Sequence, residues 1–161
     1  MRRWGIVFIV LALMVITVLS SGCTAENAKE QPCLTCTPPT PFPAIDKLYE
    51  SGFTAFINHD YPTALDFYNK SIAADPKYIR AWIGRGDTLM RMNRTSEAIS
   101  AYDSALAINN EIPEFWNKRG EALMAIGNYT EARDSFDKAL KFAPEYAAAK
   151  ENRDLAIAKL K

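Results

Sequence analysis

The stretch Pro113–Pro144 reads PEFWNKRGEALMAIGNYTEARDSFDKALKFAP, with two apolar-periodic segments on either side of the turn Gly127-Asn128-Tyr129. Apolar residues at this spacing predict two amphipathic helices joined by a short turn. The pattern recurs 34 residues earlier and, more weakly, another 34 residues earlier. Trp116 matches Trp82, Gly120 matches Gly86, Ala132 matches Ala98, Phe136 matches Tyr102 and Ala139 matches Ala105, and the first copy contributes Leu48, Gly52, Tyr61, Ala64, Tyr68 and Pro76.

These residues resemble the tetratricopeptide repeat family, whose 34-residue helix-turn-helix unit carries the pattern W-x2-L-G-x2-Y…A-x3-F…P. The resemblance covers Ile45 to Pro144. It implies an all-α fold, an α-solenoid of three helix hairpins (residues 45–78, 79–112 and 113–146) closed by a capping helix over residues 147–161. The expected helices are Asp46–Asn58, Pro62–Ala74, Tyr78–Met92, Ser96–Ile108, Glu114–Ile126, Thr130–Phe142 and Tyr146–Leu160.

Side-chain size also recurs along the three copies. Small residues are expected where the two helices of a hairpin cross, because a larger side chain would overpack the contact. Large residues are expected to fill the core beside them. The small columns are Gly52, Gly86 and Gly120 and Ala64, Ala98 and Ala132, and the large columns are Leu48, Trp82 and Trp116 and Tyr68, Tyr102 and Phe136.

Composition limits the classes of partner. The chain has 161 residues, a length typical of one domain, with 19 Lys and Arg residues against 19 Asp and Glu residues. Proteins that bind nucleic acid normally carry a basic surface with interleaved aromatic residues. This sequence shows no such pattern, so we expect no nucleic-acid partner.

Residues 1–22 have the three parts of a secretory leader, namely the basic pair Arg2-Arg3, the apolar run Ile6–Leu19 and the small residues Ser20-Ser21-Gly22. The stretch Leu19-Ser20-Ser21-Gly22-Cys23 resembles the lipobox of prokaryotic lipoproteins, although its leucine stands one place earlier than usual. The resemblance implies cleavage, lipidation of Cys23 and an exported protein anchored on the outer side of the membrane. A plain cleaved signal and an uncleaved N-terminal anchor are the alternatives.

Residues 23–44 are predicted to form a disordered, proline-rich linker, since they contain five prolines and almost no large apolar residue. Within it lies Cys33-Leu34-Thr35-Cys36. A zinc site needs four ligands, and only Cys23 and His59 could complete one. An oxidising compartment favours a disulfide, either between Cys33 and Cys36 or between two molecules. Redox or metal chemistry is the third alternative.

The family resemblance places function in a concave groove, where the first helix of each hairpin lines the binding site for a peptide or partner segment. Helical spacing makes this groove apolar at one end, mixed in the middle and acidic at the other, which favours a segment with an apolar anchor and a basic flank. By this spacing, Asp46 and Ile57 of the first repeat also face the groove. The expected groove residues are Tyr49, Phe53 and Phe56 in the first repeat, Arg80, Ile83, Asp87, Met90 and Arg91 in the second, and Glu114, Asn117, Glu121 and Met124 in the third.

Two alternatives to this interpretation exist. One concerns the aromatic residues at the apolar end of the groove, and the other concerns the kind of ligand. The aromatic residues could instead pack on Pro41-Phe42-Pro43 or on the domain edge. Chaperone-binding members of the family hold a terminal carboxylate with a clamp of Lys, Asn and Arg. The matching positions here are Tyr49, Phe53, Gly84, Glu114 and Lys118, of which only Lys118 has a suitable character, so this subtype is not expected.

Chemical motifs are scarce. His59 is the single histidine and is expected in a turn, and no catalytic set, metal-ligand spacing or phosphate-binding loop occurs, so we expect no enzyme activity, no cofactor and no metal. Three Asn-x-Ser/Thr sequences begin at Asn69, Asn93 and Asn128. Those at Asn93 and Asn128 fall in turns where a glycan fits, whereas Asn69 is disfavoured because Ser71 belongs to the packing seam.

The sequence therefore predicts a non-catalytic protein-protein interaction module, tethered at the outer face of a membrane, that binds a partner segment as an adaptor or assembly factor. The alternative is a self-associating scaffold protein, linked through the groove or through Cys33 and Cys36.

Overall fold

The computed structural model describes residues 42–161, with side chains from Ala44 onward. They fall within one compact unit, Pro41–Lys161. The described residues form helices only, which confirms the predicted all-α solenoid. The helices are α2 (Phe42–Ile57), α3 (Tyr61–Ala74), α4 (Ile79–Arg91), α5 (Thr95–Ile108), α6 (Pro113–Ala125), α7 (Tyr129–Phe142) and α8 (Ala147–Lys159).

Several predictions concern residues outside the described part of the chain. They are the leader of residues 1–22, lipidation of Cys23, the linker as far as residue 41, and the disulfide of Cys33 and Cys36.

The helix boundaries follow the sequence except at the first helix. α3 to α8 begin and end within one residue of the expected positions. α2 begins at Phe42, four residues before the expected Asp46, so the last part of the predicted linker is helical. Pro43 lies in this first turn, where its missing N–H costs no helical hydrogen bond, and a proline there is compatible with helix rather than with linker.

The turn inside each hairpin uses the same geometry three times. His59, Asn93 and Gly127 stand 34 residues apart and have φ values of 61°, 57° and 78°. The next residue in each turn donates its N–H to a carbonyl five residues back at 2.9 Å, a helix-ending arrangement that requires a left-handed residue. His59 thus lies in a turn, where its Nδ1 is 2.9 Å from the Tyr61 hydroxyl.

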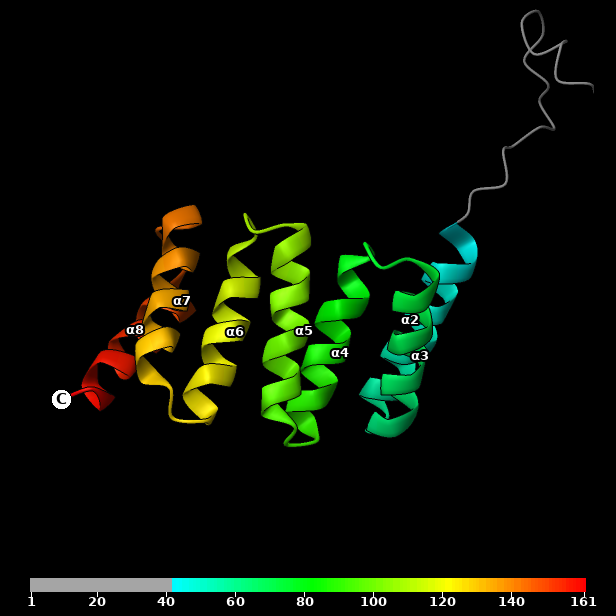
Figure 1. Ribbon diagram of the computed structural model, residues 1–161, viewed down its shortest axis with the longest axis horizontal. Coiled ribbons are helices and arrows are strands. Elements are labelled where there is room, and N and C mark those ends of the chain that lie inside the picture. Colours follow the sequence, from blue (N-terminus) through cyan, green and yellow to red (C-terminus); the bar gives the residue numbers. More distant parts are fainter. Residues whose placement is uncertain (1–41) are drawn as a thin grey trace, which may run out of the picture. The chain divides into compact units, whose positions relative to one another are not determined.

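Successive hairpins lie side by side in one row, and α8 packs on α7 at the end of it (Figure 1). α2, α4 and α6 are the first helices of the three hairpins, and α3, α5 and α7 are the second helices. α4 also contacts α2, α8 also contacts α6, and Lys118 of α6 pairs with Asp87 of α4, so the first helices and α8 form one layer. This layer carries the candidate site.

The core of each hairpin forms where a ring of the second helix lies over a glycine of the first. Phe136 is fully buried, and a Cβ added to Gly120 would clash with its ring. Gly86 stands in the same relation to Tyr102, and Gly52 to Tyr68. The predicted size columns are thereby confirmed for the glycines and for these rings. Their alanine neighbours Ala64, Ala98 and Ala132 are fully buried.

The tryptophan column lies differently from the prediction. We expected Trp82 and Trp116 to fill the core, but both are only half-buried. The indole Nε1 of Trp82 donates to the Pro76 carbonyl, and that of Trp116 donates to the Asn110 carbonyl, each at 2.8 Å. An indole N–H needs a hydrogen-bond partner, and these positions let the ring cover apolar surface while its edge holds the turn between two hairpins.

A polar ladder fixes the register between hairpins. An arginine of each later first helix meets an Asn or Asp of the preceding second helix, again at 34-residue intervals. The pairs are Arg85 Nε with Asn69 Oδ1 (3.0 Å), Arg119 Nε with Asp103 Oδ1 (2.6 Å) and Arg153 Nη1 with Asp137 Oδ1 (3.8 Å). The ladder extends to Arg153 of α8, which joins the capping helix to α7 in the register of a fourth repeat.

Candidate binding groove

Two adjoining cavities lie along α2, α4 and α6. The first has a volume of about 180 Å³ and the second about 330 Å³. Phe56 and Asp87 line both, so the two cavities form one groove. Together the cavities contain nine of the predicted groove residues, namely Tyr49, Phe53, Phe56, Arg80, Ile83, Asp87, Met90, Arg91 and Glu121.

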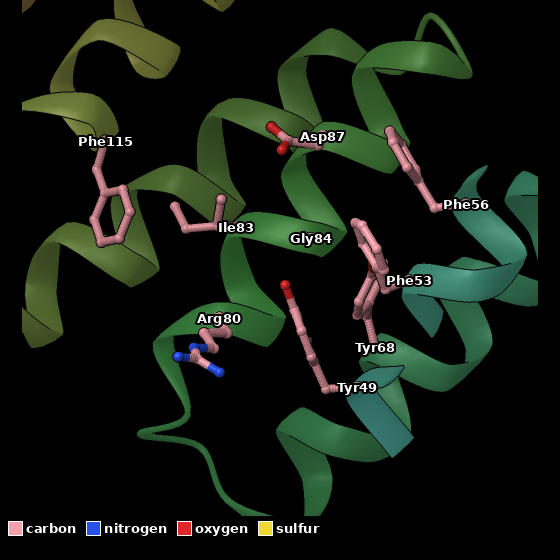
Figure 2. A pocket seen from close by; sticks show the side chains of 9 residues that line it. All are labelled: Tyr49, Phe53, Phe56, Tyr68, Arg80, Ile83, Gly84, Asp87 and Phe115. Carbon is pink, nitrogen blue, oxygen red and sulfur yellow. The ribbon is translucent and has the colours of Figure 1, made fainter. Parts of the chain in front are cut away.

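The first cavity is mainly aromatic. Figure 2 shows Tyr49, Phe53 and Phe56 on one side of the cavity, and Ile83 of α4 and Phe115 of α6 on the other. The rings of Tyr49 and Phe53 stack with centroids 6.5 Å apart. Phe53 is nevertheless 45% exposed, and a large apolar side chain that is exposed beside a cavity marks an interaction surface.

The floor of this cavity consists of Tyr68 and Gly84. A Cβ on Gly84 would lie 2.6 Å from the Tyr68 ring, so glycine at this position makes room for that ring under the groove. Burial raises the pKa of the Tyr68 hydroxyl, and burial also raises the pKa of Tyr49, which Arg80 partly offsets. Both phenols are therefore neutral at physiological pH.

The second cavity contains a closed polar network centred on Asp87. The Tyr102 hydroxyl donates to Asp87 Oδ1 at 2.7 Å, and Lys118 Nζ lies 2.9 and 3.0 Å from its two oxygens. Burial and the Asp87 carboxylate raise the pKa of Tyr102, so it remains a donor to that carboxylate. The charge of Asp87 is thus balanced within the protein by Lys118.

Unlike the charge of Asp87, the charges of Arg80 and Arg91 are not balanced by a neighbouring side chain of the described residues. Each is exposed and lines one of the cavities. Neither makes an ion pair with any residue between 42 and 161. Asp46 of α2 instead accepts a hydrogen bond from the Tyr78 hydroxyl at 2.7 Å.

α8 covers part of the third repeat, so fewer residues of this repeat line the groove than the sequence predicts. Asn117 is buried and donates to Glu121 Oε1 at 2.7 Å. Asn152 of α8 donates to Asn117 Oδ1 at 3.1 Å and to Glu121 Oε1 at 3.2 Å. A ligand would therefore have to displace α8 to reach the Asn117 side chain.

Glu114, Met124 and Ile57 line neither cavity. Glu114 is exposed, and it raises the pKa of Tyr146 together with Glu121, after the larger effect of burial. Met124 packs against the buried cluster of Leu123 and Phe136. Ile57 is 56% exposed at the end of α2.

Five lining residues were not among the predicted ligand contacts, namely Tyr68, Gly84, Tyr102, Phe115 and Lys118. Phe115 carried a usable signal, because Ala81 and Ala149 occupy the equivalent positions of other repeats and one bulky residue replaces alanine there. Tyr68 and Tyr102 belong to second helices and reach the groove only past glycines. Lys118, the one suitable clamp residue, is bound to Asp87.

The two predicted glycosylation sites have different environments. Asn93 is exposed in its turn, and no hydrogen bond of its side chain occurs among residues 42–161. Asn128 caps α7, because its Oδ1 accepts from the Glu131 N–H at 3.4 Å and its Nδ2 donates to Glu131 Oε1 at 2.9 Å. The nitrogen that would carry a glycan is thus already engaged at Asn128. Glycosylation at either site stays a prediction.

In the part of the chain from residue 42 onward, no three His, Cys, Asp or Glu side chains are grouped so that they could hold a metal ion. None of α2 to α8 is both long and apolar enough to cross a membrane.

Comparison with known proteins agrees with this geometry. Residues 83–147 match the tetratricopeptide repeat family model. The first TPR domain of Spaghetti (RPAP3), solved with an HSP90 peptide, superposes with a TM-score of 0.70 at 25% identity over 72% of this chain and 92% of that one. The Sgt2 TPR domain from Aspergillus fumigatus gives a TM-score of 0.70 at 20% identity over 74% and 81% of the two chains.

The TPR2B domain of yeast Sti1, from a complex with pHsp70, gives a TM-score of 0.64 at 22% identity over 71% and 94%. A comparison with curated protein sequences gave no match. With three glycine-centred hairpins in 34-residue register, the described chain has the tetratricopeptide repeat fold, and its residues 83–147 match that family.

Proposed function

We propose that this protein is a non-catalytic adaptor or assembly module, held at the outer face of a membrane by its N-terminal segment, which binds a segment of a partner protein in the groove of α2, α4 and α6. Tetratricopeptide repeat domains typically serve as protein-interaction modules. The observation that carries the proposal is the aromatic first cavity with an exposed Phe53 at its edge.

Related structures support a peptide as the ligand. The RPAP3 domain is described with the HSP90 peptide SRMEEVD, and the Sti1 domain with pHsp70. This chain carries Tyr49, Phe53, Gly84, Glu114 and Lys118 at the positions that match the clamp of chaperone-binding members. The acidic Glu114 would repel a terminal carboxylate, and Lys118 is held by Asp87, so we propose a partner other than a chaperone C-terminus.

The membrane tether rests on the sequence of the N-terminal segment. The basic pair, the apolar run and Leu19-Ser20-Ser21-Gly22-Cys23 together favour export and lipidation of Cys23. The proline-rich stretch that follows would then separate the lipid from the groove. A single lipid chain gives marginal membrane binding, whereas two or more chains give stable anchoring.

Phe53 and Phe142 offer a matched pair of variants, because they are exposed to similar extents, 45% and 41%, and only Phe53 lines the groove cavities. Partners crosslinked to the full chain in native membranes would be identified by mass spectrometry for wild type, Phe53→Asp and Phe142→Asp. The proposal expects one partner lost from Phe53→Asp and kept by Phe142→Asp. Equal capture by both variants would place partner binding elsewhere.

The same experiment separates the adaptor from the self-associating scaffold. An adaptor yields a different protein and a monomeric chain on sizing. A scaffold yields a second copy of this chain, with sizing and non-reducing electrophoresis showing whether the groove or Cys33 and Cys36 join the copies.

A further inference from the structure

The groove has a net positive charge that is concentrated on two residues. Arg80, Arg91 and Lys118 line the two cavities, against Asp87 and Glu121, which makes three basic side chains and two acidic ones. Asp87 is bound to Lys118 and Tyr102, and Glu121 accepts from Asn117 and Asn152. Glu121 keeps its charge, but its Oε1 is held by two amide groups. The two arginines make no ion pair with any other residue of the described chain.

The arginines lie on either side of the apolar part of the groove. Arg80 lines the first cavity beside Tyr49 and Ile83, and Arg91 lines the second beside Phe56 and Met90. Both belong to α4, eleven positions apart, which is about 16 Å along a helix axis. An extended chain covers that distance in about five residues.

We propose that the partner segment is an internal, extended stretch with an apolar side chain flanked by two carboxylate side chains about five positions apart. The apolar side chain occupies the cavity of Phe53, Phe56 and Ile83, and one carboxylate meets Arg80 while the other meets Arg91. A guanidinium binds a carboxylate through two parallel hydrogen bonds, which makes arginine well suited to this recognition. This proposal rests on the proposed function. It places acidic side chains of the ligand next to the apolar anchor, where the sequence alone favours basic ones.

The basic flank predicted from Glu114 and Glu121 does not apply at this end of the groove. Glu121 is engaged by Asn117 and Asn152, and Glu114 lines neither cavity. Acidic side chains of the ligand therefore lie over α4, and any basic side chain would lie beyond them toward α6.

The test is a displayed library of random nine-residue peptides, each flanked on both sides by a fixed glycine-serine sequence so that no terminal carboxylate is offered. The bait is the full chain in mild detergent, as wild type and as Arg80→Glu/Arg91→Glu. Lys70→Glu/Arg133→Glu is the matched control, since it makes the same charge change at exposed residues of α3 and α7. Phe53→Asp is a fourth bait, which tests the groove itself. Circular dichroism verifies that all four are folded.

Wild type and control should both enrich peptides with one large apolar residue and two Asp or Glu residues about five positions apart. The Arg80→Glu/Arg91→Glu variant should lose these peptides and enrich ones with Lys or Arg. A selected peptide, measured by fluorescence anisotropy, should bind this variant about tenfold more weakly or worse. Its affinity for wild type should fall with added salt.

Two results would overturn the proposal. The arginines would play no part in recognition if the enriched peptides lacked acidic residues, or if wild type and the Arg80→Glu/Arg91→Glu variant enriched the same peptides. Either result would leave the groove as the binding site. Peptides whose enrichment survives Phe53→Asp would contradict both this proposal and the proposed function, because binding would then lie outside the groove.

Discussion

Lys118 of α6 reaches back to Asp87 of α4, with its Nζ 2.9 and 3.0 Å from the two carboxylate oxygens. The same carboxylate accepts a hydrogen bond from Tyr102 of α5 at 2.7 Å. Asp87 therefore joins three helices at the floor of the groove. This arrangement links the second and third repeats and balances the charge of the central acidic residue of the groove.

Replacing Lys118 with Met should lower the free energy of unfolding by about 0.5–1 kcal/mol, because Asp87 loses one of its two partners. The value is modest since the Lys118 and Asp87 side chains are 36% and 30% exposed. Urea unfolding measures it. Lys70→Met is the control, because the Lys70–Asp66 pair is more exposed and its loss should cost less. Equal stability of Lys118→Met and wild type would contradict a structural role for this bridge.

Gly120→Ala should destabilise the protein by about 1–3 kcal/mol, because the new methyl group would clash with the Phe136 ring. Phe136→Leu frees space at the same contact. The cost of Phe136→Leu should therefore be smaller in the Gly120→Ala background than in wild type, which a double-mutant cycle of unfolding free energies measures. Additive costs would mean that glycine is not needed there to admit the ring.

Trp116→Phe keeps an aromatic ring but removes the Nε1 donor to the Asn110 carbonyl, a bond of 2.8 Å. We expect a loss of about 0.5–1.5 kcal/mol, the usual worth of one such hydrogen bond. Trp82→Phe removes the equivalent bond to the Pro76 carbonyl and should cost a similar amount. If both variants unfold at the wild-type denaturant concentration, these indole bonds do not stabilise the turns between hairpins.

Stability should decrease in alkaline solution. Burial and the hydrogen bond to Asp46 raise the pKa of Tyr78 to about 12. Free tyrosine ionises near pH 10, so above about pH 10 the unfolded chain loses protons that the folded chain keeps. The contribution of Tyr78 is thus fully present below about pH 10 and is lost as the pH rises toward about 12. Burial raises the pKa of Tyr68 and Tyr102 in the same direction.

Thermal melts followed across this alkaline range, together with tyrosinate absorbance, check the prediction. Tyr78→Phe should show a smaller decrease of Tm than wild type. A Tm that stays constant through the range would contradict the raised pKa values.

The sequence predicted the helices and the glycine-over-ring contacts because both depend on spacing within one 34-residue unit. It did not predict the Asp87 network or the burial of Asn117, since these depend on how separate helices meet. Asn117 and Asn152 lie 35 positions apart and form their contact only because α8 packs beside α6. The early start of α2 does not follow from the sequence, because a proline such as Pro43 is compatible both with a linker and with the first turn of a helix.

Cys23→Ser should release the protein from the membrane if Cys23 carries the lipid. We expect wild type to incorporate labelled fatty acid and to sediment with membranes, whereas the variant does neither. A Cys33→Ser/Cys36→Ser variant is the control and should behave as wild type. Membrane sedimentation of Cys23→Ser without label would instead indicate an uncleaved N-terminal anchor.

The most direct test of the groove is a photo-reactive phenylalanine analogue at position 53, compared with the same analogue at position 142, in the full chain in its native membrane. Position 53 borders the aromatic cavity and position 142 is an equally exposed apolar position away from it. A partner protein should crosslink from position 53 and not from position 142. Crosslinks from position 142 alone, or equally from both, would contradict the assignment of the groove as the binding site.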